Sequence, residues 1–374
     1  MKVLLVITKS DIGGAQVFIL NLARSFKKMG IDVEVAAGSG DYLFQELENY
    51  NIPYHYLHSL KRDFSIFSSF RFIYDLYTLL RSKRYDIVHL NSSNTLIGTI
   101  SCHLLKKRPK IVFTFHGLSF LDKNFNISVL IKPFAKLYFH FFLRMVDKPV
   151  FVSNLNYKVS IETNITRFGK VIYNGLDKRE MNYLTREEAR DFFRSKFNIA
   201  LSNNYLIGSI GRLAYQKNYG FLINIFSLIK EKIPDAKIII IGDGKKSDKL
   251  MKRVSKFGFQ NDIFLVGAIK DSYKYIRAFD VFTLPSRYEG LSISLIEAIF
   301  ADVPVLASDV GGNSEIVNSD QLFELDNSED FIAKLMKIKQ NPMHLVERNN
   351  KVKTHFELEK MITEYGELYE SLYK

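Results

Sequence analysis

The sequence predicts an α/β protein of two doubly wound, Rossmann-like domains that face each other across a cleft. Its 374 residues are too many for one ordinary core, and a hydrophobic fraction of 47% suffices for two. Short apolar runs alternate with helical patterns along the first half of the chain, and the alternation begins again after about residue 170. Strands that alternate with helices in this way form parallel sheets covered by helices on both faces.

The first domain is expected to span residues 1–170 and to begin with the strand KVLLVIT (Lys2–Thr8). This run is almost wholly apolar, as a strand buried on both faces of a parallel sheet should be. After the loop KSDIGGAQ, the apolar residues of VFILNLARSFKKMG recur at helical spacing, and Gly30 is expected to end that helix. Three later runs predict further strands: DVEVAAG, DIVHLNSS and KIVFTFHG.

The second domain is expected to span residues 171–354. Each of its predicted strands ends in a loop that carries Gly, Ser or Asp; the strands are YLIGSIGRL, AKIIIIGDG, DIFLVGAI, VFTLPS and VPVLASDVGG. The last segment, residues 355–374, predicts an amphipathic helix that packs back on the first domain. Because doubly wound domains bind ligands outside the carboxyl ends of their strands, the loops after these strands are the candidate site.

The net charge of +12 lies almost entirely in the first half of the chain. Residues 1–175 hold 23 Lys and Arg against 12 Asp and Glu, a balance of +11, which leaves +1 for residues 176–374. Within this half, residues 61–85 and 131–148 mix Phe and Tyr with Lys and Arg, which is typical of helices on an anionic membrane surface. The same pattern also fits core aromatic rings with solvated charges around them, so both interpretations stay open. No known nucleic-acid-binding module is visible, and nucleic acid is not an expected partner.

Composition also bears on the compartment. The single cysteine, Cys102, excludes an internal disulfide framework and favours a reducing compartment. No apolar run reaches the roughly 18 to 20 residues that a membrane-spanning helix needs, and the start MKVLLVITKSD is too short for a secretion signal. We therefore expect a cytoplasmic protein, peripheral at the inner face of the cell membrane if its aromatic segments bind lipid.

Two loops carry candidate binding residues. Gly13 and Gly14 lie between the first strand and the first helix, where they let the backbone approach a ligand and where helix N–H groups can bind a phosphate. In GRLAYQKN, Arg212 and Lys217 follow a predicted strand, and two cations there would neutralise a diphosphate. Neither the first loop nor the later IIIIGDGKKSD completes the G-x-G-x-x-G fingerprint, so a dehydrogenase loses its main support.

The stretch YEGLSISLIEA sets two acids, Glu289 and Glu297, on either side of seven uncharged residues. The run VFTLPS before it predicts a strand, so Glu289 falls in a loop and Glu297 on the helix that follows. Gly290 lets the loop bend so that N–H groups at the helix start face the cleft. Ser292 and Ser294 are expected to cap this helix without adding charge near a phosphate, while the apolar residues between the acids pack it on the sheet.

Several segments, taken in order, resemble the family 4 retaining glycosyltransferases of the GT-B fold: IGGAQ, TFHG, VIYNGLD, GRLAYQKN, IIIIGDG, LVGAI, LPSRYEGLSISLIEA and PVLASDVGGNSEIV. The resemblance runs from about residue 3 to about residue 320, and its most specific element is the glutamate pair with seven residues between. It implies transfer of a sugar, with retention of configuration, from a nucleotide sugar, by default a UDP-sugar. The implied acceptor is a hydroxyl of a membrane-associated glycan or glycolipid in surface polysaccharide biosynthesis, and neither a metal nor another cofactor is implied.

The resemblance also implies roles for individual residues. Arg212 and Lys217 would bind the diphosphate and Glu297 the ribose. Glu289 would bind the transferred sugar, which His116 would approach from the first domain. The full set of implied donor-binding residues is Gly13, Gly14, Arg212, Lys217, Gly267, Ala268, Ile269, Glu289, Gly290, Leu291 and Glu297, and the implied catalytic residues are His116 and Glu289.

Three other functions are compatible with the same two-domain architecture. A nucleotide-sugar epimerase would convert the donor without an acceptor, and a non-catalytic nucleotide-sugar-binding protein would turn nothing over. An inverting transferase would differ only in the anomeric configuration of its product. His116 and Glu289 favour an enzyme over a binding protein, and analysis of the product separates the remaining alternatives.

Overall fold

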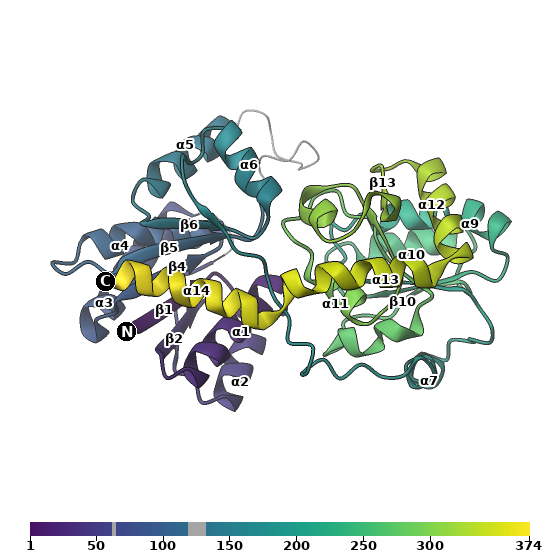
Figure 1. The fold of residues 1–374 in the computed structure, drawn as a ribbon, viewed down its shortest axis with the longest axis horizontal. Helices are drawn as coiled ribbons and strands as arrows, with labels where there is room; N and C mark the ends of the chain where they lie inside the picture. The colour runs from purple at the N-terminus through teal and green to yellow at the C-terminus, as the bar shows by residue number, and fades with distance from the viewer. Residues whose placement is uncertain (62–64, 119–131) are drawn as a thin grey trace. The chain divides into compact units, whose positions relative to one another are not determined.

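The computed structural model describes residues 1–61, 65–118 and 132–374. These residues form two compact units (Figure 1). Unit 1 contains the described residues of 1–175 together with 358–374, and unit 2 contains residues 176–357. The chain passes between the units after Gly175 and again after Glu357, a few residues beyond the domain limits expected at 170 and 354. Residues 62–64 and 131 of the two aromatic segments lie outside the described residues.

Unit 1 is built on a seven-stranded parallel sheet with the order β3-β2-β1-β4-β5-β6-β7. Val3 of β1 pairs with Val33 of β2 on one side and with Ile87 of β4 on the other. The predicted strands in the first half are confirmed as β1, β2, β4 and β5. The strand bounds are β1 (Lys2–Ile7), β2 (Asp32–Ala37), β3 (Tyr54–Tyr56), β4 (Ile87–Asn91), β5 (Lys110–Phe115), β6 (Lys148–Phe151) and β7 (Lys170–Val171).

The helices of unit 1 include the last helix of the chain, which follows unit 2 in sequence (Figure 1). Among the described residues of both units, no helix is long and apolar enough to cross a membrane. The helix bounds in unit 1 are α1 (Gly14–Lys28), α2 (Tyr42–Asn49), α3 (Ile66–Lys83), η1 (Ser93–Gly98), α4 (Thr99–His103), α5 (Lys132–Leu143), α6 (Asn154–Glu162) and α14 (Leu358–Tyr373).

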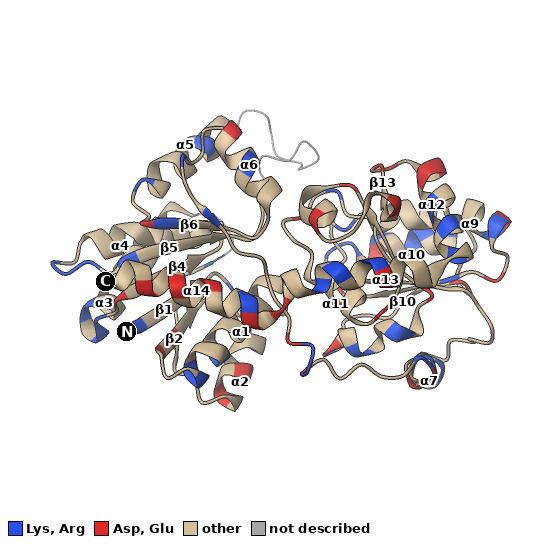
Figure 2. Ribbon diagram, in the orientation of Figure 1, with Lys and Arg blue, Asp and Glu red and all other residues tan. Residues whose placement is uncertain are grey.

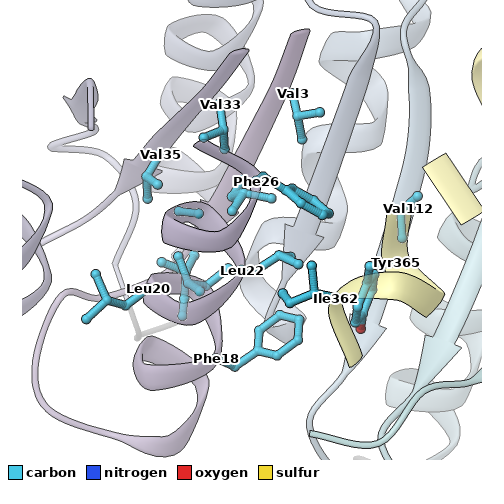
Figure 3. Packing of buried hydrophobic residues seen from close by; sticks show 14 of the residues in the cluster. Val3, Phe18, Leu20, Leu22, Phe26, Val33, Val35, Val112, Ile362 and Tyr365 are labelled. Atoms are coloured by element: carbon cyan, nitrogen blue, oxygen red, sulfur yellow. The ribbon is translucent and has the colours of Figure 1, made fainter. Parts of the chain in front are cut away.

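The core of unit 1 lies between one face of its sheet and the helices α1, α2 and α14. Figure 3 shows Phe18 and Phe26 of α1 beside strand residues such as Val3, with Ile362 and Tyr365 contributed by α14. All five of these side chains are at least 94% buried. Burying large side chains of this kind stabilises a fold by roughly 1.5–3 kcal/mol each, so α14 is an integral part of the unit 1 core.

Helix α1 ends at Lys28, and Gly30 stops it as the sequence predicted. The N–H of Gly30 donates to the carbonyl of Lys27 at 3.0 Å, and the N–H of Ile31 donates to that of Phe26 at 3.0 Å. Gly30 has a φ of 77°, in the left-handed region that glycine adopts without steric cost. This pattern is a Schellman motif, which satisfies the last carbonyls of the helix and turns the chain toward β2.

A buried hydrogen-bond network ties α14 to the sheet of unit 1. His89 of β4 lies 2.5 Å through Nδ1 from the hydroxyl of Tyr369 and 2.7 Å through Nε2 from Oγ1 of Thr114. The hydroxyl of Tyr365 lies 3.0 Å from the same Thr114 oxygen. Burial lowers the pKa of His89 well below its usual value, so the ring is neutral and each nitrogen has one partner.

Unit 2 is built on a six-stranded parallel sheet with the order β10-β9-β8-β11-β12-β13. Its five predicted strands are confirmed as β8 to β12, whereas the two-residue β13 is too short for an apolar run to indicate. The strand bounds are β8 (Leu206–Ile210), β9 (Lys237–Ile241), β10 (Ile263–Leu265), β11 (Val281–Leu284), β12 (Val305–Ser308) and β13 (Leu322–Phe323).

The helices of unit 2 cover this sheet, and the first of them begins with a capping box in which Thr185 and Glu188 bond reciprocally. Their bounds are α7 (Arg186–Phe197), α8 (Tyr219–Asn224), α9 (Phe226–Lys232), α10 (Ser247–Lys256), η3 (Ser272–Ala278), α11 (Ile293–Phe300), η4 (Gly311–Glu315), η5 (Ser319–Gln321), α12 (Ser328–Gln340), α13 (Pro342–Lys353) and η6 (Thr354–Phe356).

Both sheets reverse their strand order at an internal point. In unit 1 the order runs outward in opposite directions from β1 and β4, and in unit 2 it does so from β8 and β11. At such a point the loops after the two central strands diverge to opposite faces of the sheet and leave a crevice at its carboxyl edge, where doubly wound proteins bind ligands. The α/β class with two doubly wound sheets is therefore confirmed, and each unit has a defined place to look for a site.

Candidate functional site

The loops after β8 and β11, at the reversal point of the unit 2 sheet, form the candidate site. They comprise residues 211–218 and residues 285–292. The N–H of Arg287 donates to the carbonyl of Gln216 at 2.7 Å, and Gln216 Nε2 donates to the carbonyl of Tyr288 at 3.0 Å. These bonds join two motifs that are far apart in sequence but adjacent in the sheet.

An ion pair between Lys217 and Glu289 lies at the junction of these loops. Lys217 Nζ is 2.7 Å from Glu289 Oε1, and the two side chains are only 14% and 7% exposed. Gln216 Nε2 donates to the second carboxylate oxygen, Oε2, at 3.3 Å. Removing two charges from water is costly, and the pairing and the added hydrogen bond offset that cost. The resemblance implied that Lys217 binds the diphosphate of the donor and that Glu289 binds its sugar. In the structure these two side chains bind each other.

The start of α11 has the polar, uncharged character that the sequence predicted. Ser292 Oγ accepts a hydrogen bond from the N–H of Leu295 at 3.4 Å, which confirms Ser292 as the cap. Ser294 does not cap the helix; its hydroxyl lies 3.2 Å from that of Ser292. Leu295 and Ile296 are completely buried, as expected of residues that pack α11 on the sheet. No acidic side chain lies in the first turn, so the N-terminal end keeps its positive partial charge.

Glu297 lies one turn into α11, as predicted, and its environment changes its ionisation. Burial raises the pKa of its carboxyl to about 8, although the charge of Lys217 partly opposes this rise. The carboxyl is therefore protonated at neutral pH and can donate a hydrogen bond as well as accept one. The hydroxyl of Tyr183 donates to the backbone carbonyl of Glu297 at 2.8 Å, which fixes this turn of the helix.

The loop after β12 supports the loop that carries Glu289. The N–H of Gly312 donates to the carbonyl of Gly290 at 3.0 Å. A Cβ atom on Gly311 would lie 1.9 Å from the backbone oxygen of Glu289, and Gly311 has a φ of 52°. Only glycine fits a backbone approach this close, so Gly311 is required for the position of Glu289.

The remaining predicted residues of unit 2 lie on neighbouring loops at the same edge of the sheet. Arg212 lies two residues after the end of β8 and is exposed. Gly267, Ala268 and Ile269 follow β10, and the carbonyl of Gly267 accepts the N–H of Gly242 at 2.8 Å. The loops after β8, β9, β10 and β11 thus all present predicted residues or their supports at one edge.

Unit 1 holds the other predicted residues at its own reversal point and on the loop after the next strand, β5. Gly13 is the N-cap of α1 and Gly14 its first residue, directly after the loop that follows β1. His116 follows β5, and its Nε2 lies 3.1 Å from Oδ1 of Asn91 at the end of β4. Burial lowers the pKa of His116 to about 4, so the ring is neutral at pH 7. A neutral ring must carry its proton on Nε2 to donate to the Asn91 carbonyl oxygen.

Sequence reasoning did not find four residues that position the site: Asn91, Gln216, Tyr183 and Gly311. Gly311 could have been predicted, because the glycine pair after the apolar run VPVLASD indicates a close approach of two backbone segments. The other three act through hydrogen bonds to residues distant in sequence, and nothing in their own neighbourhoods indicates those partners.

Two family models match consecutive parts of the chain. Residues 12–180 match Glycosyltransferase Family 4, and residues 190–357 match Glycosyl transferases group 1. Together the two matches cover every strand of the two sheets except β1, and they include every predicted site residue.

Curated relatives match over most of their length. The chain is 26% identical over 356 residues to an Escherichia coli UDP-Gal:alpha-D-GlcNAc-diphosphoundecaprenol alpha-1,3-galactosyltransferase, covering 88% of this chain and 85% of that protein. It is also 26% identical to CapM, a capsular polysaccharide biosynthesis glycosyltransferase of Staphylococcus aureus, covering 84% of this chain and 81% of that protein.

Solved structures share the fold. Anabaena HepE in complex with UDP and glucose superposes with a TM-score of 0.83 at 18% identity, covering 99% of this chain and 100% of that one. Sucrose-phosphate synthase from Thermosynechococcus elongatus superposes with a TM-score of 0.80 at 16% identity, covering 100% of this chain and 99% of that one. With both family matches and this shared architecture, the chain belongs to the glycosyltransferases of the GT-B fold and consists of a Glycosyltransferase Family 4 domain and a Glycosyl transferases group 1 domain.

Proposed function

We propose that this protein transfers a sugar from a UDP-sugar to a hydroxyl of a lipid-linked glycan, with retention of anomeric configuration and without a metal ion. The observation that carries the proposal is the partly buried Lys217–Glu289 pair, which lies at the reversal point of a doubly wound sheet. The names of the relatives support the substrate class: one is a UDP-galactose transferase that acts on a diphosphoundecaprenol acceptor, and another serves capsular polysaccharide biosynthesis.

The pair suggests how the donor enters. A diphosphate competes with Glu289 for Lys217, so donor binding exchanges one anionic partner of the lysine for another. Glu289 is then released to accept hydrogen bonds from the hydroxyls of the sugar. Arg212 and the positive end of α11 add to the field that neutralises the diphosphate.

In the proposed reaction, the bond from the anomeric carbon to the diphosphate oxygen breaks, and its electron pair stays on that oxygen. The acceptor oxygen bonds to the same face of the anomeric carbon and gives its proton to the departing phosphate. The charge that develops on the diphosphate is stabilised by Arg212 and Lys217. No residue of the chain forms a covalent intermediate, which leaves Glu289 and His116 as groups that hold the sugar.

The donor test is thermal stability against UDP-, GDP- and ADP-sugars in the presence of a chelator. A ligand at a hundred times its Kd adds roughly 2.7 kcal/mol to the folded state. We expect a shift with a UDP-sugar that is lost in Arg212→Ala and kept in Lys252→Ala, which removes an exposed cation from α10. Binding that requires a divalent ion, or that survives in Arg212→Ala, would contradict the proposed donor site.

The reaction test is analysis of the product formed from the donor identified in this way and a short-chain diphospho-lipid acceptor carrying one sugar. Retention predicts the same anomeric proton coupling in the product as in the donor. An inverted coupling would show an inverting transferase, and conversion of the donor without acceptor would show an epimerase.

The acceptor proposal includes docking on an anionic membrane, and it depends on the helices α3 and α5 of unit 1. Each helix buries one apolar stripe in the unit, for example Phe72 and Leu76 on α3 and Phe139 on α5. Each also exposes a second stripe at helical spacing, with side chains 57–81% exposed: Ile66, Phe67, Phe70 and Tyr74 on α3, and Phe134, Leu137 and Phe141 on α5. The interpretation as core rings holds for the buried faces of these helices, and their exposed faces are the surface that we propose for membrane binding.

Cations accompany both exposed stripes (Figure 2). Helix α3 carries Arg71, Arg81 and Lys83, and α5 carries Lys132 and Lys136. Within the described bounds of these helices the sole acid is Asp75, which accepts a hydrogen bond from Ser59. Exposed aromatic rings beside positive charge match the interface of an anionic bilayer, where rings enter the headgroup region and cations contact phosphates.

Vesicle sedimentation tests the docking proposal. We expect the protein to bind phosphatidylglycerol–phosphatidylcholine vesicles, and Phe134→Ser/Leu137→Ser/Phe141→Ser to bind at least about tenfold more weakly. The matched control replaces three exposed apolar residues of unit 2, as Leu228→Ser/Met251→Ser/Met343→Ser. Failure of the unaltered protein to bind at low salt, or equal losses in both variants, would overturn the docking proposal and leave the donor proposal intact.

A further inference from the structure

A cavity in unit 2 borders the loops that hold Lys217 and Glu289. It has a volume of about 470 Å³ and lies between α8 and α10, and neither Lys217 nor Glu289 lines it. The loops after β8 and β11 contribute Tyr215 and Arg287 to its wall. Cavities of this size hold small metabolites.

Positive charge dominates this cavity. Its wall contains Lys246, Lys249 and Arg253 from α10 and the residue before it, together with Arg287 and a single carboxylate, Asp326. Arg287 forms an ion pair with Asp326 at 2.6 Å. In the part of the chain that the structure describes, the three cations at α10 form no ion pair with a carboxylate. The cavity thus has four positive charges and one negative charge, a surplus of three.

Hydrogen bonds hold the floor of the cavity in place. Arg287 donates through NH2 to Oδ1 of Asn218 at 2.8 Å, and Asn218 Nδ2 donates to Oδ1 of Asp326 at 2.8 Å. The Tyr215 ring has Lys246 Nζ at 4.8 Å and the guanidinium of Arg287 at 5.0 Å from its centroid. These contacts are cation–π interactions, which keep both cations close to the ring.

A glycine gives Arg253 its place in the wall. A Cβ atom on Gly220 would lie 2.6 Å from NH1 of Arg253, so the guanidinium occupies space that any side chain at position 220 would fill. The pKa of Lys246 is lowered by burial and, next, by repulsion from Lys249, Arg287 and Arg253. Ligand-free, the protein therefore carries an electrostatic cost at this cavity that a bound anion would remove.

We propose that this cavity is a binding site for a small soluble phosphate ester, such as a sugar phosphate, distinct from the donor site. A surplus of three positive charges suits a group that carries two negative charges, and arginine and lysine are the side chains that most often bind phosphate. Tyr215, Phe221 and Leu250 provide ring and apolar surface in the same cavity for the organic part. The proposal does not depend on which donor or acceptor the enzyme uses.

The test compares two double variants with the same change in charge. Lys246→Ala/Arg253→Ala removes two cations from the cavity wall, and Lys245→Ala/Lys252→Ala removes two exposed cations from the same segment outside it. The probe is glucose 1-phosphate, titrated calorimetrically at low salt. We expect at least about tenfold weaker binding in the first variant and a change within about twofold in the second. Equal losses, or no binding by the unaltered protein, would overturn the proposal.

Two further arms keep the result specific. Arg212→Ala, which alters the donor site, is expected to leave binding of glucose 1-phosphate unchanged, and loss of binding there would assign the probe to the donor site instead. If the first variant fails to fold, Lys249→Glu takes its place. This change reverses one exposed charge of the wall without removing buried groups, and it is expected to weaken binding of glucose 1-phosphate. Vesicles of phosphatidic acid distinguish a lipid phosphate: loss of vesicle binding in the first double variant alone would overturn the assignment to a soluble ester.

Discussion

At the residue scale, the Lys217–Glu289 pair links the stability of the protein to the donor binding that we propose. The two groups satisfy each other in a partly buried place, so removal of one leaves the other charged without a counter-ion. The same chemistry makes the pair exchangeable, because a diphosphate offers the lysine a stronger anionic partner than one carboxylate.

Glu289→Gln tests this pairing. We expect the free energy of unfolding to fall by roughly 2–4 kcal/mol, because Lys217 keeps its charge and loses its counter-ion. Urea denaturation measures the change. The control is Glu162→Gln, which breaks an exposed pair with Lys158 whose side chains are 73% and 58% exposed, and which should cost less than about 0.5 kcal/mol. Similar losses in both variants would show that Lys217 and Glu289 are solvated in solution.

Glu34 in β2 predicts a dependence of stability on acid. Burial alone would raise the pKa of its carboxyl, but hydrogen bonds from Lys2, His55, Tyr85 and Lys83 lower it to about 2. A lowered pKa in the folded state means that the stabilisation is complete above the unfolded value of 4.5 and is lost as the pH falls from 4.5 to 2. The loss amounts to at most about 3 kcal/mol.

Urea denaturation between roughly pH 2 and pH 7 measures this effect, because this range includes the pKa values of the Glu34 carboxyl in the folded and unfolded states. In Glu34→Gln the free energy of unfolding should decline less steeply below pH 4.5 than in the unaltered protein. Parallel curves for the two proteins would show that other carboxylates cause the acid sensitivity.

Glu297 predicts that the free energy of unfolding changes with pH in the opposite direction. Its pKa is raised from 4.5 to about 8, so the folded state keeps a proton that the unfolded chain has released. Stability associated with this group therefore decreases as the pH rises from 4.5 to 8 and stays low above it. Glutamine is neutral at every pH, so near pH 9 we expect Glu297→Gln to be more stable than the unaltered protein by about one to a few kcal/mol. The upper limit is about 1.4 kcal/mol for each unit by which the pKa is raised. Equal stability of the two proteins at that pH would show that the carboxyl is solvated.

At the scale of elements, the apolar runs were sufficient to place the long strands and α11, because a parallel strand buried on both faces has almost no polar residues. They were insufficient for β3, β6, β7 and β13, which have three, four, two and two residues and whose pairing depends on the neighbouring strand. Glu297 could be placed on α11 from the spacing alone. Its protonation could not, because that depends on how the packed helix excludes water.

The contact between Lys217 and Glu289 was also beyond the sequence, although each residue was identified. Their approach depends on β8 and β11 being neighbours, and that follows from the strand order of the sheet. Gln216 is part of the same junction, and only the folded loop shows that its amide reaches the Glu289 carboxylate.

The packing of α14 predicts that the hydroxyl of Tyr369 contributes to the stability of the protein. Tyr369→Phe removes the partner of His89 Nδ1 and leaves that buried nitrogen without a hydrogen bond. We expect a loss of about 1–3 kcal/mol in the free energy of unfolding, measured by urea denaturation. Tyr373→Phe is the control, because Tyr373 lies on the same helix and is exposed. An equal effect of both changes would mean that the hydroxyl of Tyr369 contributes nothing specific.

At the scale of the whole molecule, the uneven charge of the chain has a measurable consequence. The balance of +11 in residues 1–175 predicts that the proposed vesicle binding has an electrostatic part in addition to the apolar one. We expect binding to phosphatidylglycerol-containing vesicles to weaken at least about tenfold between roughly 0.05 M and 0.5 M NaCl, since the Debye length shortens over this range. Binding that ignores salt would assign the interaction to the exposed rings alone.

The position of α14 also concerns how the protein is made. Ribosomes synthesise a chain from its N-terminus, and domains that lie first in sequence generally fold first. Unit 1 cannot do so here, because residues 358–374 complete its core and are synthesised after all of unit 2. A nascent chain therefore carries an open unit 1 with exposed apolar surface until residues 358–374 have been synthesised, and only a chain that includes this helix can close the core.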